Sequence, residues 1–259
     1  MTEQVLQVAE GFWNIRGDFR IGGVVNIGTH ASLVRRRNGR FLLLDAYTLQ
    51  GEVKAEIDAL TNNGEDIEAV IQLHPFHTVH VPWAHQQFPQ ARHYGTRRHV
   101  ERFTDLPWEK ALSESDECAA LFADDLQFSV PTGVDFISKN ENLHFSSVLA
   151  YHPESRTIHV DDTLMVLQLP GPVGRLQTPG VAFHLTLAKT LERRAGAAAD
   201  FRDWATGLAD QWADAEHLCA AHTGALVSKG GQQHDIAGLI CKALKKAERT
   251  LQAHEKKFG

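Results

Sequence analysis

The sequence predicts an α/β fold, and two observations support that class. Short apolar segments of strand length alternate along the chain with segments whose apolar residues recur at helical spacing. The chain has 259 residues, of which 43% are hydrophobic, so it can bury a full core. We expect one domain over residues 1–259.

Strands dominate the first part of the chain. The predicted strands cover residues 12–15, 24–36, 40–44 and 67–73. Asn38-Gly39 predicts a hairpin between the second and third of these, because this dipeptide favours the tight turns that join antiparallel strands. A helix over 51–61 is predicted by Val53, Ile57 and Leu60, which share one helical face.

The second part of the chain repeats the alternation. Residues 108–125 are polar and helical in tendency. The predicted strands cover residues 126–130, 145–151, 157–160 and 218–221, and the predicted helices cover residues 181–193, 198–212 and 234–254. The apolar stripe of the last helix predicts packing against the core rather than a binding surface.

Three histidines follow the apolar strand over 67–73: His74, His77 and His80. Pro75 disfavours the helical region at His74 and holds that residue extended at the end of the strand. His77 and His80 are three residues apart and can share one face of a turn. Neutral imidazole is a common metal ligand, so this segment supports a metal site and a solvated, histidine-rich loop about equally.

Further segments place histidine or aspartate at the ends of predicted strands. His144 precedes the strand over 145–151, Asp161 and Asp162 follow the strand over 157–160, and His222 follows the run 218–221. Sites in open α/β sheets gather at strand ends. Together with His74, this pattern favours a metal site.

These segments resemble those of the metallo-β-lactamase-fold (metallo-hydrolase/oxidoreductase) superfamily, over nearly the whole chain. The segment 42–45 resembles the early strand whose aspartate, here Asp45, supports the metal loop. The segment 144–164 is similar to a hairpin that begins at a histidine ligand and leads to Gly-Asp-x-Leu, so Asp162 takes the place of the bridging aspartate and Asp161 that of the glycine. His222-Thr-Gly224 resembles the late Gly-His-Gly element.

The resemblance implies an αββα sandwich, with two mixed β-sheets packed face to face and helices on both outer faces. It also implies a metal site with Asp162 as the catalytic residue. The implied ligands are His74, His77, His144, Asp162 and His222, with His80 in reserve. Asp45 is expected to accept a hydrogen bond from a ligand histidine, and Asp161 replaces Asp162 as ligand if the strand register shifts by one.

The chain departs from the family signature His-x-His-x-Asp-His. Counted back from Phe88-Pro89, His77 is the last histidine and His74 the second, with Gln72 in the first place and Phe76 in the aspartate place. A rival register makes His80 the last histidine and His77 the second. Both registers leave the aspartate place apolar, which argues against a standard binuclear site and indicates a divergent branch.

The ligand types favour a metal-dependent hydrolase. Imidazoles with one carboxylate suit zinc, as one or two ions, with iron or manganese as alternatives. Bound zinc lowers the pKa of water to roughly 7, so a metal-bound hydroxide can attack an ester, amide, lactone or phosphoester. Two alternatives stay open: a non-catalytic member of the fold that acts as a binding protein, which Phe76 favours, and an iron-dependent redox or sulfur enzyme.

Charge and hydropathy limit the partners. A formal charge of -6 and a pI near 6.2 argue against a nucleic-acid surface. The start is not that of a signal peptide, and no segment approaches the roughly 18 apolar residues of a membrane span. We expect a cytoplasmic protein with a small-molecule substrate, no nucleic-acid partner and no membrane, and leave a homo-oligomer open.

Several other histidines are expected to be unconnected with the site. His85, His93 and His99 are predicted to lie on the surface. His152 and His159 are predicted to be an ordinary turn and an ordinary strand histidine, because strand parity sets His159 opposite Asp162.

Overall fold

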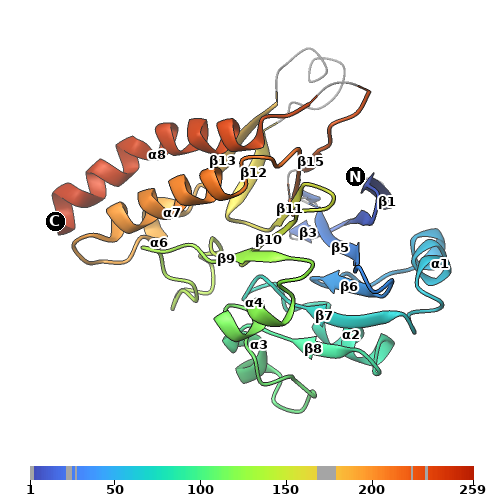
Figure 1. Ribbon diagram of the computed structural model, residues 1–259. Helices are drawn as coiled ribbons and strands as arrows, with labels where there is room; N and C mark the ends of the chain where they lie inside the picture. The colour runs from blue at the N-terminus through green and yellow to red at the C-terminus, as the bar shows by residue number, and fades with distance from the viewer. Residues whose placement is uncertain (1–2, 22–24, 27, 168–178, 223, 231–232) are drawn as a thin grey trace.

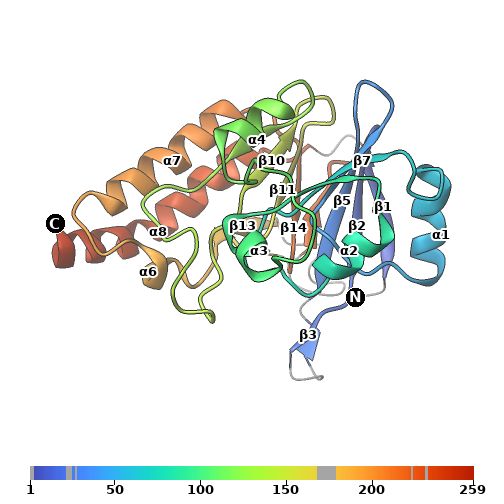
Figure 2. The same ribbon diagram turned by 90° about the horizontal axis from the view of Figure 1, so that it is seen from below.

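Two mixed β-sheets face each other, and helices cover their outer faces (Figures 1 and 2). The computed structural model describes residues 3–21, 25–26, 28–167, 179–222, 224–230 and 233–259. In both views α7 and α8 lie on one side of the sheets and α1 on the opposite side. The predicted α/β class and αββα arrangement are confirmed.

The first sheet is built mainly from the N-terminal part of the chain. Its strands, in spatial order, are β1 (Gln4–Ala9), β2 (Phe12–Gly17), β5 (Thr29–Arg35), β6 (Phe41–Leu44), β7 (Ile67–Ile71) and β8 (Arg92–Tyr94). The first four are antiparallel neighbours, whereas β6, β7 and β8 are parallel. The predicted hairpin joins β5 and β6, and Gly39 has the positive φ of 85° that this turn needs.

The predicted strand over 24–36 is divided. A short pair, β3 (Arg20–Ile21) and β4 (Val25–Asn26), precedes β5 in the chain. Val24 and Ile27 lie outside the described residues.

The second sheet contains, in spatial order, β15 (Gly224–Leu226), β14 (His217–Ala220), β11 (Thr157–Val160), β10 (Leu149–His152) and β9 (Gln127–Ser129). Strands β11 and β14 are parallel, and the other neighbours are antiparallel. A separate hairpin pairs β12 (Leu164–Leu167) with β13 (Gly180–Phe183).

Two helix predictions are wrong in part. Strand β13 occupies the start of the helix predicted over 181–193, and α6 covers only Leu187–Thr190. Val181 and Phe183 are buried with period two and pair with β12, so strand pairing prevails over the helical tendency of this segment. Within the predicted helical region 108–125, α4 covers only Asp116–Leu121.

Three buried clusters hold the layers together. One joins the outer face of the first sheet to α1 (Gly51–Leu60) and α2 (Val81–Gln87). Another joins the outer face of the second sheet to α7 (Ala197–Gln211) and α8 (Ile236–Phe258). The third cluster lies between the sheets and includes residues of α4. Helix α3 (Arg97–Arg102) follows β8 in the chain. No helix within the described ranges is long and apolar enough to cross a membrane.

Two contacts tie the sheets together where the polar residues gather. The Val148 N–H donates to Leu73 O over 2.9 Å, just after the end of β7. Arg16, in β2, donates to Ala220 O over 2.6 Å and to Ala221 O over 2.9 Å, at the end of β14. The carboxyl ends of β7 and β14 are therefore held at the same edge of the two sheets.

Candidate metal centre

The Asp162 carboxylate lies at the centre of the candidate site, surrounded by four imidazoles. Asp162 Oδ2 lies 3.2 Å from His74 Nε2 and 3.7 Å from His77 Nε2. The same oxygen lies 4.0 Å from His144 Nδ1, and Oδ1 lies 3.2 Å from His222 Nε2. The structure thus brings together the five residues predicted as the main ligands.

Backbone carbonyls fix two of these rings. His222 Nδ1 lies 2.6 Å from Gly28 O, and His144 Nε2 lies 2.7 Å from Glu141 O. A carbonyl oxygen only accepts, so these two ring nitrogens carry the protons. The other nitrogen of each ring therefore presents its lone pair toward Asp162, which is the tautomer a metal ligand needs.

His74 is held through the loop that follows it. The Phe76 N–H donates to His74 Nδ1 over 3.1 Å, so the proton of the neutral ring lies on Nε2, facing Asp162. Burial lowers the pKa of His74 to about 4, and the ring is neutral at pH 7. A metal ion at His74 Nε2 would have to displace that proton.

His77 lies between two carboxylates. Its Nδ1 lies 3.3 Å from Asp161 Oδ1, while its Nε2 faces Asp162. Burial acts to lower the pKa of His77, but the two carboxylates outweigh burial and hold the pKa well above its usual range. Burial likewise acts to raise the pKa of Asp162, and the contacts with His74 and His77 instead hold it well below its usual range. The two carboxylates thus favour the protonated, cationic form of His77, whose side chain is 21% exposed.

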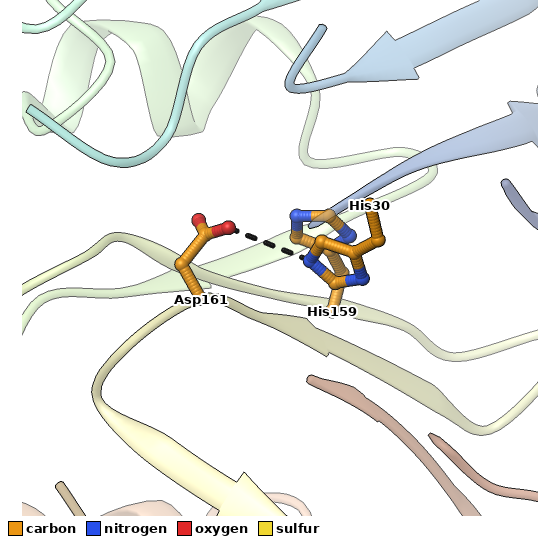
Figure 3. A group of neighbouring side chains, drawn as sticks. All are labelled: His30, His159 and Asp161. Carbon is orange, nitrogen blue, oxygen red and sulfur yellow. Dashed lines mark ion pairs between the residues drawn. The ribbon is translucent and has the colours of Figure 1, made fainter. Parts of the chain in front are cut away.

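A second group of buried side chains lies on the Asp161 side of His77. Figure 3 shows the ring of His30, from β5, stacked on the ring of His159, from β11, beside Asp161; the ring centroids are 4.3 Å apart and the planes differ by 12°. The dashed ion pair joins His30 Nε2 to Asp161 Oδ1 over 3.4 Å. All three residues are at most 2% exposed.

Hydrogen bonds determine the tautomer of His30. Asn14 Nδ2 lies 3.0 Å and Arg16 Nη1 lies 3.5 Å from His30 Nδ1. Both neighbours are donors, so Nδ1 accepts and the proton of His30 lies on Nε2, facing Asp161. Burial holds the pKa of His30 well below its usual range, which keeps the ring neutral. This tautomer directs the Nε2–H of His30 at Asp161.

These contacts indicate that Asp161 positions His77. Its Oδ1 faces His30 Nε2 and His77 Nδ1, so a proton on His77 Nδ1 leaves Nε2 directed at Asp162. A carboxylate that accepts from the second nitrogen of a metal-binding histidine fixes the tautomer and ring orientation.

Asp45 supports the loop that carries His74. Its Oδ1 accepts from the Leu73 N–H over 2.8 Å, and its Oδ2 lies 2.9 Å from His159 Nε2. Burial first, and then the nearby Asp161, raise the pKa of Asp45 to about 6. The imidazole that Asp45 contacts is therefore His159, and not one of the predicted ligands as expected. His159 is correspondingly part of the buried network and not an ordinary strand histidine.

The reserve ligand His80 is held by Thr48 and lines the cavity over the cluster. Its Nδ1 lies 2.8 Å from Thr48 Oγ1 and accepts from the Thr48 N–H over 3.3 Å. Phe76, in the signature's aspartate place, stacks on His144 with ring centroids 4.8 Å apart and planes 16° apart. The register that makes His77 the last histidine of the signature therefore agrees with the geometry, because His77 faces Asp162 and His80 faces Thr48.

A cavity of about 270 Å³ opens over the cluster. Polar and apolar side chains line it, and the polar ones are Thr29, His30, Asp45, His77, His80, His144 and His222. The apolar lining residues are Phe19, Ala46, Phe76 and Val79. The arrangement can therefore admit a small molecule to the imidazoles around Asp162.

Sequence reasoning missed His30 altogether. The signal was present as paired polar residues in two apolar strands: Asn14 and Arg16 in β2 lie opposite Ser32 and His30 in β5. Each pair is spaced by two residues, so both members point to the same face of the sheet. This pattern becomes informative only when the two strands are known to be neighbours.

The predicted surface positions of His85, His93 and His99 are wrong. All three are buried. His85 stacks on His93 with centroids 3.8 Å apart, and the His99 and Thr96 side chains form the capping box of α3. The segment around Trp108 packs against His85 and His99, which the local sequence does not indicate.

The sequence matches no family model and no curated protein. The structure, in contrast, is similar to solved metallo-β-lactamases. FIM-1 from Pseudomonas aeruginosa, in its mono-zinc form, is 12% identical with a TM-score of 0.60 over 95% of this chain and 96% of that chain. The metallo-β-lactamase from Hirschia baltica is 14% identical with a TM-score of 0.59 over 97% and 98% of the two chains. The metallo-β-lactamase from Erythrobacter litoralis is 15% identical with a TM-score of 0.57 over 97% and 96%. This protein therefore has the metallo-β-lactamase fold.

Proposed function

We propose that this protein is a metal-dependent hydrolase whose metal ion is held by His74, His77 and Asp162, with His144 and His222 completing the site. The observation that carries the proposal is the buried Asp162 carboxylate with four imidazole nitrogens 3.2 to 4.0 Å from its oxygens. Zinc suits these donors, and one of the structurally similar metallo-β-lactamases is a mono-zinc form. Iron and manganese are the alternatives.

The donor atoms are spaced as ligands. In a tetrahedral zinc site with metal–ligand distances of about 2.0–2.1 Å, two ligand atoms lie roughly 3.3 Å apart. The two shortest contacts of Asp162, to His74 and His222, are both 3.2 Å. The Nε2 atoms of His74 and His77 are buried and find no hydrogen-bond partner in the described part of the chain. These nitrogens are therefore close to the carboxylate but outside good hydrogen-bond geometry, as expected of groups placed to share a cation.

The buried charges also favour a cation. Asp45, Asp161 and Asp162 are all buried around the centre, whereas the cations beside them are the buried Arg16 and the partly exposed His77, whose protonated form the carboxylates favour. A metal ligand must be deprotonated, so an ion at His77 Nε2 would take the place of the His77 positive charge. A divalent ion would then bring the buried groups close to neutrality.

When bound, such an ion supplies Lewis acidity, which lowers the pKa of a coordinated water to about 7 and polarises a carbonyl or phosphoryl oxygen. The protein's own residues orient the imidazole rings of the site. Asp161 holds His77 with Nε2 toward Asp162, and the carbonyls of Gly28 and Glu141 hold the rings of His222 and His144. The expected reaction is hydrolysis of an ester, amide, lactone or phosphoester.

Metal analysis and a substrate panel test the proposal. The purified protein should hold about one metal equivalent and hydrolyse at least one ester, lactone, thioester or phosphodiester, with loss of activity on chelation. His144→Ala should abolish activity with the fold intact, because this ring is partly exposed and contributes little to the core. A metal-loaded protein that is inert across the panel, or an activity that survives chelation, would overturn the hydrolase proposal.

A binding protein without turnover is the second candidate, and Phe76 favours it. An apolar ring stands where the resemblance places a metal-binding carboxylate, and it stacks on His144. This reading expects the loaded protein to bind small molecules but to turn over none. If the protein is purified without added metal and retains iron, that result would instead favour redox or sulfur chemistry.

A further inference from the structure

We infer that the cavity over the metal centre selects a small, uncharged ester or lactone with a compact apolar group, and discriminates against substrates that carry a carboxylate or phosphate. This inference rests on the proposed hydrolase function and names its substrate class. Three features of the cavity carry it: its volume, the chemistry of its wall and the charges around it.

The volume limits the size of the substrate. The cavity measures about 270 Å³, less than twice the roughly 150 Å³ that accommodates a benzene molecule. Scaled from benzene, the space holds about ten non-hydrogen atoms. It also lies below the range of about 300–1,000 Å³ that is typical of pockets for drug-sized ligands. A phenyl ester of a short acid fills such a space, whereas a second ring does not fit inside it.

Four of the cavity's lining residues are apolar, and they lie among the lining imidazoles. Phe19, Ala46, Phe76 and Val79 line the cavity, and Val79 is 68% exposed, so it lies at the solvent boundary. An aromatic or aliphatic group removes apolar surface from water when it contacts these side chains. The reacting carbonyl then lies toward His77, His144 and His222, which line the same cavity.

The charged residues around the cavity disfavour a substrate that carries a carboxylate or phosphate away from the reacting bond. Among the lining residues that the structure describes, there is no lysine or arginine, and the one carboxylate is Asp45. The buried carboxylates of Asp45, Asp161 and Asp162 would be balanced by Arg16 together with one divalent ion. The ion therefore leaves no excess positive charge to attract a carboxylate or phosphate elsewhere on the substrate. A desolvated anion without a partner is strongly unfavourable.

Arg98 is a candidate counter-ion beside the cavity, and it contacts Phe76 and Glu141. Its guanidinium carbon lies 4.6 Å from the centroid of the Phe76 ring, and its Nη2 donates to Glu141 over 2.8 Å. Phe76 lines the cavity, whereas Arg98 does not. The aromatic ring and Glu141 therefore hold the guanidinium of Arg98 outside the cavity lining.

Three matched esters test the inference on the metal-loaded protein: phenyl acetate, its 4-carboxylate and its 4-trimethylammonium derivative. We expect kcat/KM for phenyl acetate to exceed that for each charged ester by about tenfold or more, corrected for the rates in water. A larger neutral ester, 4-biphenylyl acetate, should also be disfavoured. An anionic or cationic ester that is hydrolysed as well as phenyl acetate would overturn the inference.

Binding of non-hydrolysable ketones separates this inference from the proposed function. Phenylacetone and its 4-carboxylate, measured by calorimetry on the zinc-loaded protein, should show the same preference for the neutral compound. If none of the esters is hydrolysed but the neutral ketone binds at least tenfold more tightly, the hydrolase proposal fails and the selectivity stands. If the ketones bind equally, or neither binds, the selectivity inference fails whatever the activity.

A substitution at the cavity boundary should shift the preference. Val79→Lys places a cation at this exposed position, where a surface ion pair is weak, so the anionic ester should gain about two- to fivefold relative to phenyl acetate. Leu121→Lys is the matched control, because Leu121 is also exposed but lies in α4 and does not line the cavity. Equal shifts in the two variants would show that the selectivity does not arise in this cavity.

Discussion

Zinc bound at the candidate centre should stabilise the folded chain, and Asp162→Asn should remove this stabilisation. A ligand at about 100 times its Kd stabilises the folded state by about 2.7 kcal/mol. For 259 residues at about 2.1 cal/mol/K each, the unfolding entropy is roughly 0.54 kcal/mol/K, so Tm should rise by about 5 °C. Asp162 faces all four imidazoles, and its loss should abolish the shift.

Asp161→Asn should have a smaller effect. Among the five clustered residues Asp161 contacts His77, as a positioning group, and loss of such a group typically weakens metal binding about 10- to 100-fold. At the same zinc concentration the remaining shift in Tm is then about 1–3 °C. The two aspartates are neighbours in the chain, so the comparison separates a ligand from the residue that orients a ligand.

Calorimetry of the wild type and variants, each with chelator and with zinc, measures these shifts. Asp125→Asn is the control, because Asp125 is also buried but pairs with Arg36 over 2.7 Å, outside the cluster. That variant should unfold at a lower temperature in both conditions and keep the full zinc shift. If Asp161→Asn loses as much of the zinc-induced rise in Tm as Asp162→Asn, or more, Asp161 does not act only by orienting His77. The role of His30 as a donor to Asp161 would then also be refuted.

Three further predictions concern the same centre. Phe76→Asp should raise the zinc content from about one to about two per chain, whereas Phe76→Leu should leave it at one; elemental analysis decides. Zinc uptake should release a proton from His77, so the calorimetric binding enthalpy should depend on the ionisation enthalpy of the buffer, and a buffer-independent enthalpy would contradict this. Burial raises the pKa of Asp45 to about 6, above its unfolded value, so its ionisation opposes folding as pH rises from about 4 to 6. In urea unfolding of the metal-free protein, the wild type should therefore lose about 2 kcal/mol relative to Asp45→Asn over this range, and a constant difference would contradict it.

The elements that the sequence predicted well are those with a local signal. The helix α8 follows from an apolar stripe at helical spacing, and the β5–β6 hairpin follows from Asn38-Gly39. Strand β13 was predicted as helix because its four residues gain their strand character from pairing with β12, which is not visible in the segment itself. Strand β1 was missed for the same reason, since its exposed edge carries polar residues and its pairing partner is β2.

The residues of the candidate site likewise divide into those with a local sequence signal and those without one. His74, Asp162 and His222 could be predicted because each directly follows an apolar strand, and strand ends in this class of fold meet at one edge. His30 lies inside a strand and contacts Asp161, 131 positions further along the chain, so nothing near it in sequence indicates its role. Its tautomer depends on Asn14 and Arg16, from a third segment.

The two departures from the family signature are linked through His77. The chain lacks the carboxylate that the signature places at position 76 and has one at position 161, where glycine is usual. A carboxylate at 76 would lie on the cavity side, beside His144, where it could hold a second ion; the carboxylate of Asp161 instead lies on the buried side, against His77 Nδ1. Under the proposed function, the carboxylate at 161 orients the ligand His77 without adding a ligand. The proposal therefore predicts one tightly held ion beside a cavity wall that is apolar at Phe76.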